Sequence, residues 1–559
     1  MSGRLSSRFD RWPRRRVLGA GAMGVAGLAG LALTGCGDDD DDGGVPGPAG
    51  TPRPHERQRG GILRTLGGPV GATLDIHKAR SAAEILLWQW AGNPLIRFSA
   101  RPPYDVQPDL ARALPELSPD GMNAIARLRP DAKWQNRFPL SGRAISAQDV
   151  KASFDRVKAL GQNAPRSGNY SNIDSVTVQD DLTIQFKLKS PQADFYNILA
   201  DQCDAIIPKE LAARGAEAIT KLEDVIGTGP YELASFDAGR KLEVRRRGDG
   251  YWKPDTAWLD GWQMVTVTDE GQRANSLFAG LGEIAEVSPS IARIFDQDAN
   301  FQVVRSTSSA RECVLINHTS GPWKDPRVRL AFARAVDRTQ LYPAALEGAG
   351  VFGGPMTPAA VAWALTAADF KSLPGFGDRD TELTEARKLL AAAGLANGFD
   401  DKLTVVDSAK LPALAQVIID NVAAAGIRLK LDTVGDFAVA TDKARRGDFT
   451  LILTQLLAGI YPDAQLYLYH HSKNGAANFG KYASAELDAK LDKQRVTFDP
   501  AARLALVQDI QRYIIANPGP VWIGSRTQAT VVSSRVHEYL VPPFSAGYAA
   551  AEEAWLSPE

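Results

Sequence analysis

The sequence predicts a mixed α/β fold, and three observations support this prediction. The first half carries short segments in which apolar and polar residues alternate, separated by turn residues, a pattern typical of antiparallel strands. The second half alternates amphipathic helical patterns with short apolar strands, which is typical of an α/β unit. No repeat with a period of about 20–50 residues is visible, which argues against solenoids and propellers.

In the first half, residues 176–178 and 182–188 alternate with a period of two around residues 179–181, and this pattern predicts a hairpin. Ser146-Ala147-Gln148-Asp149 precedes apolar residues at helical spacing, so we expect a capped amphipathic helix there. Residues 242–245 predict a further strand.

In the second half, the predicted helices have clear start and stop signals. Proline near the first turn favours a helix start, and glycine just after the last turn favours an end. The pattern predicts helices over residues 326–346, 381–393, 412–425 and 501–516, and strands over 403–406, 427–431 and 450–453.

The composition is that of a soluble globular chain long enough for two to four domains: 559 residues, 44% hydrophobic and 23% charged. Lys and Arg total 64 against 65 Asp and Glu. Residues 1–35 hold six arginines and one aspartate, which leaves the rest of the chain with a net charge of −6. A mildly acidic body lacks the basic face that nucleic-acid binding requires, so we expect no nucleic-acid partner.

The N-terminus predicts an export signal. Arg14 and Arg15, followed after one residue by an apolar pair, resemble a twin-arginine signal, although Arg16 is additional and Val17 replaces the usual Phe. The apolar segment 17–33 is rich in Gly and Ala, and is therefore too weakly hydrophobic for a stable membrane span.

The same segment ends in Leu33-Thr34-Gly35-Cys36, which resembles the bacterial lipobox. Residues 1–36 are therefore predicted to be a signal that ends in a lipidated Cys36, and two or more acyl chains anchor a protein firmly. Residues 37–59 are acidic and rich in Gly and Pro, which predicts a disordered tether. We expect an exported protein that is anchored to the cell membrane by this lipid.

The remaining chemistry-bearing residues are sparse. Cys203 and Cys313 are compatible either with a disulfide or with two buried thiols, and the sequence leaves both open. His470 and His471 would face opposite ways on a strand, which makes a poor metal pair. We expect neither a metal nor a cofactor. No Gly-x-Ser-x-Gly, His-Glu-x-x-His or Gly-rich phosphate loop occurs, so we predict a protein that is not an enzyme.

Several segments together resemble the large oligopeptide/nickel-type solute-binding family, often called family 5. They keep one order across about residues 60–530, which makes the combined signal strong although each is weak alone. They are Gly60-Gly61-Ile62-Leu63 with Thr73-Leu74-Asp75, Gln107-Pro108-Asp109-Leu110-Ala111 with Leu117-Ser118-Pro119-Asp120-Gly121, residues 128–134 and 146–150, Gly227-Thr228-Gly229-Pro230-Tyr231, Tyr251-Trp252, Asn317 with residues 325–329 and 335–338, and Tyr461-Pro462-Asp463.

The resemblance implies a two-lobe clamp of the periplasmic-binding-protein type (type II, cluster C). It places the first lobe at residues 60–305 and 520–559, with an extra subdomain at about 76–204, and the second lobe at 306–519. The implied function is that of a monomer which encloses a small solute between its lobes and delivers it to the permease subunits of an ABC importer. The alternatives are an exported hydrolase and an accessory protein that reports a ligand without transport.

The identity of the solute stays open. Peptide-binding relatives carry a "W-x-A-D-Y-x-D-P" stretch whose first aspartate pairs with the peptide ammonium. Here Leu457 replaces the tryptophan and Ile460 replaces that aspartate. A buried ammonium without a carboxylate is costly, so a peptide-like solute or another polar organic molecule is expected. The candidate ligand-binding residues are Trp90, Asn93, Trp363, Tyr461, Asp463 and Asn478.

Overall fold

The computed structural model describes residues 57–558, except residues 72, 80–81, 102–103, 166, 202–204, 408–409, 436, 457–458, 475–476 and 542–551. The predicted signal with Arg14, Arg15 and Cys36, and most of the predicted tether, lie outside the described residues. Cys203 and Leu457 do so as well. Residues 55–559 form one compact unit.

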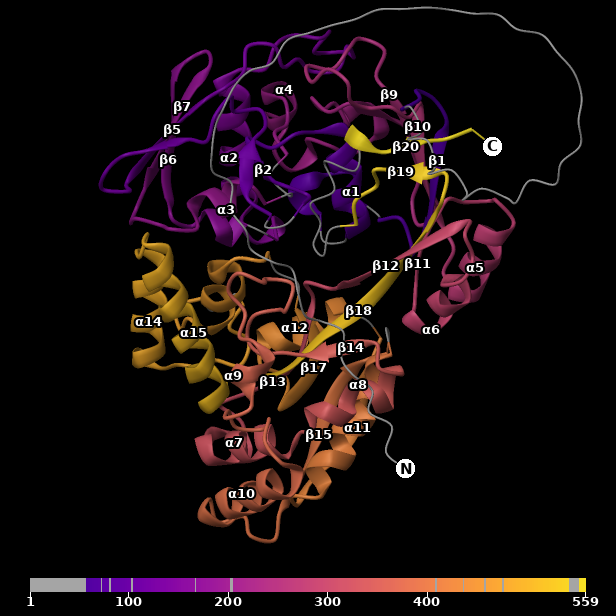
Figure 1. Ribbon diagram of the computed structural model, residues 1–559. Coiled ribbons are helices and arrows are strands. Elements are labelled where there is room, and N and C mark those ends of the chain that lie inside the picture. Colours follow the sequence, from indigo (N-terminus) through magenta and orange to yellow (C-terminus); the bar gives the residue numbers. More distant parts are fainter. Residues whose placement is uncertain are drawn as a thin grey trace, which may run out of the picture. The chain divides into compact units, whose positions relative to one another are not determined.

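A sheet of twelve described strands passes through this unit, in the order β16-β15-β17-β13-β18-β11-β1-β10-β9-β8, with β12 and β14 also paired to β18 (Figure 1). In this order, the strands before β18 belong to the second lobe of the predicted clamp, and the strands after β18 belong to the first lobe. The strands of this sheet are β1 (Ile62–Gly67), β8 (Tyr231–Asp237), β9 (Lys241–Arg246), β10 (Gly261–Thr266), β11 (Ile284–Val287), β12 (Phe301–Thr307), β13 (Arg311–Ile316), β14 (Gly350–Phe352), β15 (Phe399–Val406), β16 (Ile427–Val434), β17 (Leu451–Leu456) and β18 (Val521–Ser533).

Strand β18 connects the lobes by changing partners along its length. Val521 and Trp522 pair with β13, whereas residues from Thr527 onward pair with β12. The first half of β18 thus pairs with strands of the second lobe, β13 and β14. The chain also crosses between the lobes at residues 308–310, between β12 and β13.

The extra subdomain has its own sheet, in the order β4-β5-β7-β6, covered by α2 (Ala147–Leu160). The predicted hairpin is confirmed as β6 (Ile173–Asp180) and β7 (Thr183–Leu188). The predicted cap of α2 is also confirmed, because Ser146 and Asp149 form a capping box. The remaining strands of the subdomain and of the C-terminal segment are β2 (Ile96–Phe98), β3 (Val106–Pro108), β4 (Glu116–Leu117), β5 (Asn123–Arg127), β19 (Val536–His537) and β20 (Trp555–Leu556).

The second lobe is an α/β unit, as predicted. Strand β15 is parallel to both β16 and β17, and α11 (Leu411–Ala423) packs against β15 and β16. The predicted helix over residues 326–346 is wrong in one respect, since the structure divides it into α7 (Pro326–Ala335) and α8 (Arg338–Leu346). The reason is Asp337, whose side chain accepts a hydrogen bond from the Thr339 N–H at 3.0 Å and so starts a new helix.

The other described helices flank these sheets. They are α1 (Ala82–Ala91), α3 (Phe195–Leu199), α4 (Lys209–Ala212), α5 (Glu270–Phe278), α6 (Pro289–Ala292), α9 (Ala367–Phe370), α10 (Arg379–Ala392), α12 (Phe437–Arg446), α13 (Leu468–His470), α14 (Ala485–Arg495) and α15 (Pro500–Ala516). Within the described part of the chain, no helix combines the length and apolar character that a membrane crossing requires.

Candidate functional site

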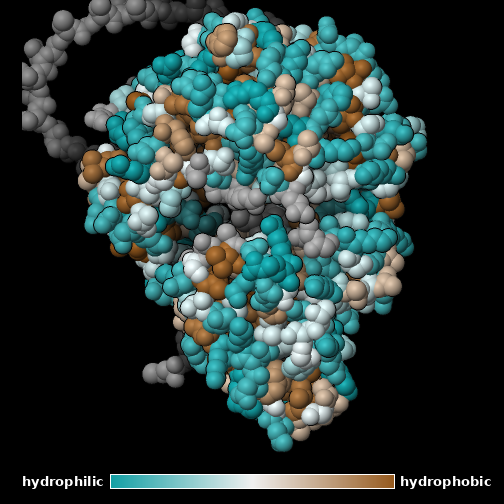
Figure 2. All heavy atoms as spheres, turned by 180° about the vertical axis from the view of Figure 1, so that it is seen from behind, coloured by the Kyte–Doolittle hydropathy of each residue, from teal (hydrophilic) through white to brown (hydrophobic). Residues whose placement is uncertain are grey.

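The candidate site lies where the two lobes face each other. Figure 2 shows the surface hollowed between the lobes on the face opposite to that of Figure 1. The lobes are connected covalently through β18 and residues 308–310. They also touch at a second place, where residues 192–194 of the subdomain meet residues 461–503 of the second lobe. The lobes are thus joined by two covalent crossings and by a non-covalent contact.

The non-covalent contact is a buried polar network that we call the interlobe latch. It consists of Gln192 and Asp194 of the first lobe and Asp463, Arg495 and Arg503 of the second. Asp194 Oδ2 accepts a hydrogen bond from the Asp463 N–H at 2.8 Å and lies 2.7 Å from Arg503 Nη2. Asp463 Oδ2 accepts from Gln192 Nε2 at 2.7 Å and from Arg495 Nε at 2.9 Å. Every charged group of the latch has a partner of opposite charge.

Burial and pairing compete in setting the pKa values of the latch. Burial raises the pKa of Asp194 and outweighs the opposing effect of the Arg503 guanidinium, while Asp463 nearby raises it further. For Arg495 the balance is reversed. Burial lowers its pKa, but the Asp463 carboxylate and the Tyr467 hydroxyl together outweigh that effect, so the pKa is raised. Charges held in this way are costly to separate from their partners inside the protein.

The Tyr461-Pro462-Asp463 segment of the second lobe packs against the first lobe. Tyr461 is 2% exposed and belongs, with Ala464, to the hydrophobic core of the subdomain. Its hydroxyl lies 3.5 Å from Asp201 Oδ2. The chain then forms a π-helical turn over Asp463–Tyr467, a feature that is frequent at functional sites.

A second set of polar contacts fixes this segment to the crossing between the lobes. Gln465 Oε1 accepts from the Thr357 N–H at 2.8 Å, and Gln465 Nε2 donates to the Gly459 carbonyl at 2.7 Å. Thr357 Oγ1 lies 3.1 Å from the Ser308 carbonyl and 3.1 Å from Ser525 Oγ. Ser308 and Ser525 are themselves in the two crossing segments, so the crossings and the Tyr461 segment form one connected structure.

The structure places Trp90 and Asn93 inside the first lobe rather than at an open surface. Trp90 is 0% exposed and stacks on Trp262 with ring centroids 4.8 Å apart. Asn93 donates from Nδ2 to the Tyr251 hydroxyl at 3.1 Å and accepts at Oδ1 from the Thr228 hydroxyl at 2.9 Å. In this conformation both residues support the lobe.

The second-lobe candidates lie at two different places. The Trp363 ring, which is half-buried, lies beneath the guanidinium of Arg503 at 5.1 Å, next to the latch. Asn478 is buried and holds a loop, because Nδ2 donates to the Tyr482 carbonyl at 2.6 Å. The structure therefore brings Trp363, Tyr461 and Asp463 to the lobe contact and leaves Asn478 as a brace.

Sequence reasoning missed the latch partners of Asp463. Gln192 and Asp194 lie in a subdomain loop. Arg495 is the last residue of α14, and Arg503 lies in the first turn of α15. Charged residues at such positions are usually solvated, so no sequence signal separates them from surface residues. Arg311, at the start of β13, was missed for the same reason.

His470 and His471 lie at the end of a helical segment, not on a strand as assumed in the sequence analysis. His470 accepts from Trp522 Nε1 at 3.2 Å, and its Nδ1 lies 2.9 Å from the Leu466 carbonyl. Burial lowers its pKa to about 3, so this imidazole is neutral. Among the described residues, no group of three or more His, Cys, Asp or Glu side chains is placed to hold a metal ion.

Two further features lie outside the lobe contact. Cys313 is a buried free thiol, and burial raises its pKa to about 12. A cavity of about 190 Å³ opens on the second lobe, where Arg338, Phe352, Phe370 and Phe376 contribute to its lining. None of the predicted site residues lines that cavity.

Comparison with known proteins places the chain in a family. Residues 105–479 match the model of the bacterial extracellular solute-binding proteins, family 5. The glutathione-binding protein GsiB of Escherichia coli strain K12 is 30% identical over 289 residues, which cover 51% of this chain and 53% of that protein. The same protein of Shigella flexneri matches equally. The chain thus spans about half the length of these curated relatives.

Solved structures share the fold. DppA from Helicobacter pylori, in complex with peptide STSA, superposes with a TM-score of 0.77 at 22% identity, covering 90% of this chain and 99% of that chain. NikZ from Campylobacter jejuni, in complex with Ni(L-His), superposes with a TM-score of 0.74 at 19% identity, covering 88% and 99%. The two-lobe α/β fold and the matched residues agree: the chain belongs to the bacterial extracellular solute-binding proteins, family 5.

Proposed function

We propose that the protein captures a small solute between its lobes outside the cytoplasm and delivers it to the permease subunits of an ABC importer. The observation that carries this proposal is the interlobe latch. It joins the lobes by complementary charges, at a place separate from the covalent crossings. Such a latch stabilises a closed state, and a solute that contacts both lobes shifts the equilibrium toward that state. We propose a monomer that acts by binding and not by catalysis.

The proposed cargo is a peptide-like or other polar organic molecule. The curated relatives are glutathione-binding proteins, and this supports a solute of comparable size and polarity. Ile460, which replaces the peptide-anchoring aspartate, packs against the apolar cores of both the subdomain and the second lobe. The position thus supplies packing in place of a charge for an ammonium group.

The proposed solute contacts come from the lobe interface. Half-buried Trp363 lies beside the latch and offers aromatic surface, which binds organic solutes at a small cost in conformational entropy. We propose that Tyr461, which is buried beside the latch, contacts the solute from the same interface. We propose that Asp463 acts by holding the lobes closed, and that Trp90, Asn93 and Asn478 support the site through the packing and hydrogen bonds described above.

The sequence features of the N-terminus support export through a twin-arginine signal and lipidation at Cys36, followed by a tether. The proposed first lobe comprises residues 60–305 and the C-terminal return of the chain, with the subdomain at about 76–204, and the proposed second lobe comprises 306–519. The pairing of β18 supports moving the return of the chain to the first lobe to about residue 527.

The test is to identify the solute and then to titrate it. Protein purified without refolding is denatured, and the released small molecules are identified by mass spectrometry. Calorimetric titration of the identified solute then compares the wild type with Trp363→Ala and Tyr461→Ala. We expect both substitutions to weaken binding at least tenfold. Unchanged affinity in both would refute the proposed contacts, and chemical turnover of the solute would refute the binding role.

A further inference from the structure

Arg311 occupies a distinctive place in the fold. It is the first residue of β13, directly after the crossing at residues 308–310. On the neighbouring strand it pairs with Leu456, the last residue of β17, and the chain then continues toward Tyr461. Both strand ends therefore point toward the first lobe. Arg311 therefore lies beside the crossing and next to the segment that enters the subdomain core, and we call this place the floor of the interlobe region.

The guanidinium of Arg311 is buried with only one of its edges bonded. The side chain is 1% exposed. Nη1 donates to the Pro355 carbonyl and, at 3.4 Å, to the Gln465 carbonyl. Nε and Nη2 have no hydrogen-bond partner in the described structure. These two nitrogens lie on the same edge of the planar group, where their N–H bonds form the fork that fits one carboxylate.

Within the part of the chain that the structure describes, no carboxylate is paired with Arg311. The guanidinium lies against two aromatic rings: its central carbon is 4.2 Å from the ring centroid of Trp522 and 5.5 Å from that of Tyr469. Glu312 follows in the chain, but its carboxylate already accepts from Tyr342 Oη at 2.8 Å, Gln455 Nε2 at 2.8 Å and Arg526 Nε at 2.5 Å. The burial of Arg311 lowers its pKa to about 10, as expected for a cation without a carboxylate partner.

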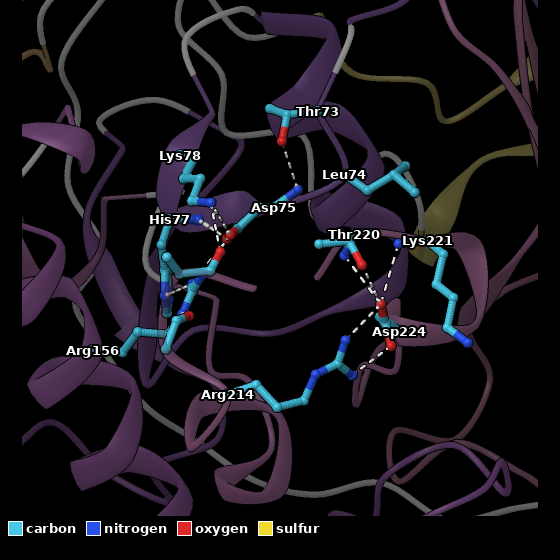
Figure 3. A network of polar contacts seen from close by, with 12 residues as sticks. Thr73, Leu74, Asp75, His77, Lys78, Arg156, Arg214, Thr220, Lys221 and Asp224 are labelled. Atoms are coloured by element: carbon cyan, nitrogen blue, oxygen red, sulfur yellow. Dashed lines mark hydrogen bonds and ion pairs between the residues drawn. The ribbon is translucent and has the colours of Figure 1, made fainter. Parts of the chain in front are cut away.

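Arg156 and Arg338, two other buried arginines, show two ways in which this protein satisfies such a group. Arg156, also 1% exposed at its side chain, forms a two-pronged pair with Asp75 (Figure 3). Arg338 has no carboxylate partner, but its guanidinium donates to four backbone carbonyls. Arg311 has neither arrangement on its Nε–Nη2 edge. Unsatisfied buried donors are rare in native proteins, and a missing ligand is one of their causes.

We propose that Arg311 is the anchor for a carboxylate of the solute, bound by the Nε–Nη2 edge at the floor of the interlobe site. The inference rests on the proposed function and narrows it to solutes that carry at least one carboxylate. Because the guanidinium is enclosed, the bound carboxylate is shielded from water, and this strengthens the charge-assisted hydrogen bonds. An uncharged solute would leave the edge unsatisfied and would bind less well.

The experiment compares Arg311→Gln and Arg311→Met with the wild type. Ala-Ala-Ala is titrated as the free acid and as the C-terminal amide, and glutathione as the free acid and as the amide of both of its carboxyl groups. For the acid that binds, we expect the amide to bind the wild type at least tenfold more weakly. In Arg311→Gln the affinity for the acid should fall at least thirtyfold, and the difference between acid and amide should disappear. Equal binding of the acid by wild type and variant overturns the proposal.

The melting temperature of the solute-free protein provides a test that needs no known solute. Arg311→Met removes an unpaired buried charge, so we expect an unchanged or higher melting temperature. Arg156→Met is the matched control and should melt lower, because it leaves Asp75 unpaired. A decrease in Arg311→Met comparable to that of the control means that Arg311 serves the structure, and this overturns the proposal.

If the wild type binds neither acid, neither is its solute. The carboxylate anchor can still be tested with small anions. Melting is then measured in formate, in phosphate and in chloride at equal ionic strength. Formate should stabilise the wild type more than chloride does and should not stabilise Arg311→Met. Equal effects of formate on both proteins overturn the anchor. Stabilisation by phosphate alone overturns its assignment to a carboxylate.

Discussion

The interlobe latch and the floor at Arg311 are both buried, both polar and both close to the Tyr461 segment, yet they treat charge in opposite ways. In the latch, Asp194 and Asp463 each meet an arginine of opposite charge. At the floor, one edge of Arg311 meets no acceptor among the described residues. Buried pairs are costly to break, whereas a buried unpaired charge is costly to keep.

The difference suggests a division of labour between the two regions. The latch is complete without a solute and, in the proposed mechanism, stabilises the closed arrangement. The floor is incomplete until an anion arrives. A protein built in this way closes most stably when the solute supplies the missing charge, because the solute then has a higher affinity for the closed state than for the open state.

The largest expected effect comes from breaking the latch at its most buried pair. Arg503→Met leaves the Asp194 carboxylate without its guanidinium in a site where Asp194 is 0% exposed. We expect the closed state to lose about 3 kcal/mol, equivalent to roughly a hundredfold loss of solute affinity. Calorimetric titration measures this loss. The matched control is Arg305→Met, which removes an exposed pair with Asp296 and should change the affinity less than about threefold.

The pH dependence of stability tests the region around Arg311, through the buried imidazole of His470. The pKa of buried His470 is about 3, against an ordinary value of 6.5, because burial and, to a smaller extent, Arg311 disfavour its charged form. The unfolded chain takes up a proton below pH 6.5 and the folded protein does not, so stability is lost as the pH falls from about 6.5 toward 3.

From these values we expect His470 to account for about 2 kcal/mol of destabilisation between pH 7 and pH 5. His470→Asn keeps an oxygen that accepts from Trp522 and should remove that part of the pH dependence, as urea unfolding at the two pH values would show. An identical pH dependence in both proteins would exclude His470 as its source.

The smallest effect is expected from Asp463→Asn, which keeps the shape of the latch and removes one charge. Arg495 remains 16% exposed at its side chain, so water compensates part of the loss. We expect about 1.5 kcal/mol, or roughly a tenfold weaker solute affinity. Solution scattering without solute should show a larger radius of gyration than that of the wild type. An unchanged radius together with an unchanged affinity would mean that the latch does not control closure.

Local elements were predictable from the sequence, and contacts between distant segments were not. The β6–β7 hairpin and the cap of α2 depend on residues that are neighbours in the chain. The break between α7 and α8 was missed because one cap residue, Asp337, lies within an otherwise continuous helical pattern.

The candidate site was predictable only in part. The Tyr461 segment was found by its resemblance to the family, but the tertiary environment decides whether an aromatic residue such as Trp90 lies in the core or in a cleft. The pairing of Asp194 with Arg503 joins segments far apart in the chain, and the unpaired state of Arg311 depends on where every nearby carboxylate goes. Neither can be deduced from residue spacing.

The most direct test of solute capture is mass spectrometry of the small molecules released from natively purified wild type and Arg311→Gln. The account predicts one predominant solute that carries a carboxylate, released from the wild type in near-stoichiometric amount and largely absent from the variant. An uncharged solute released in equal amounts from both proteins would contradict the account.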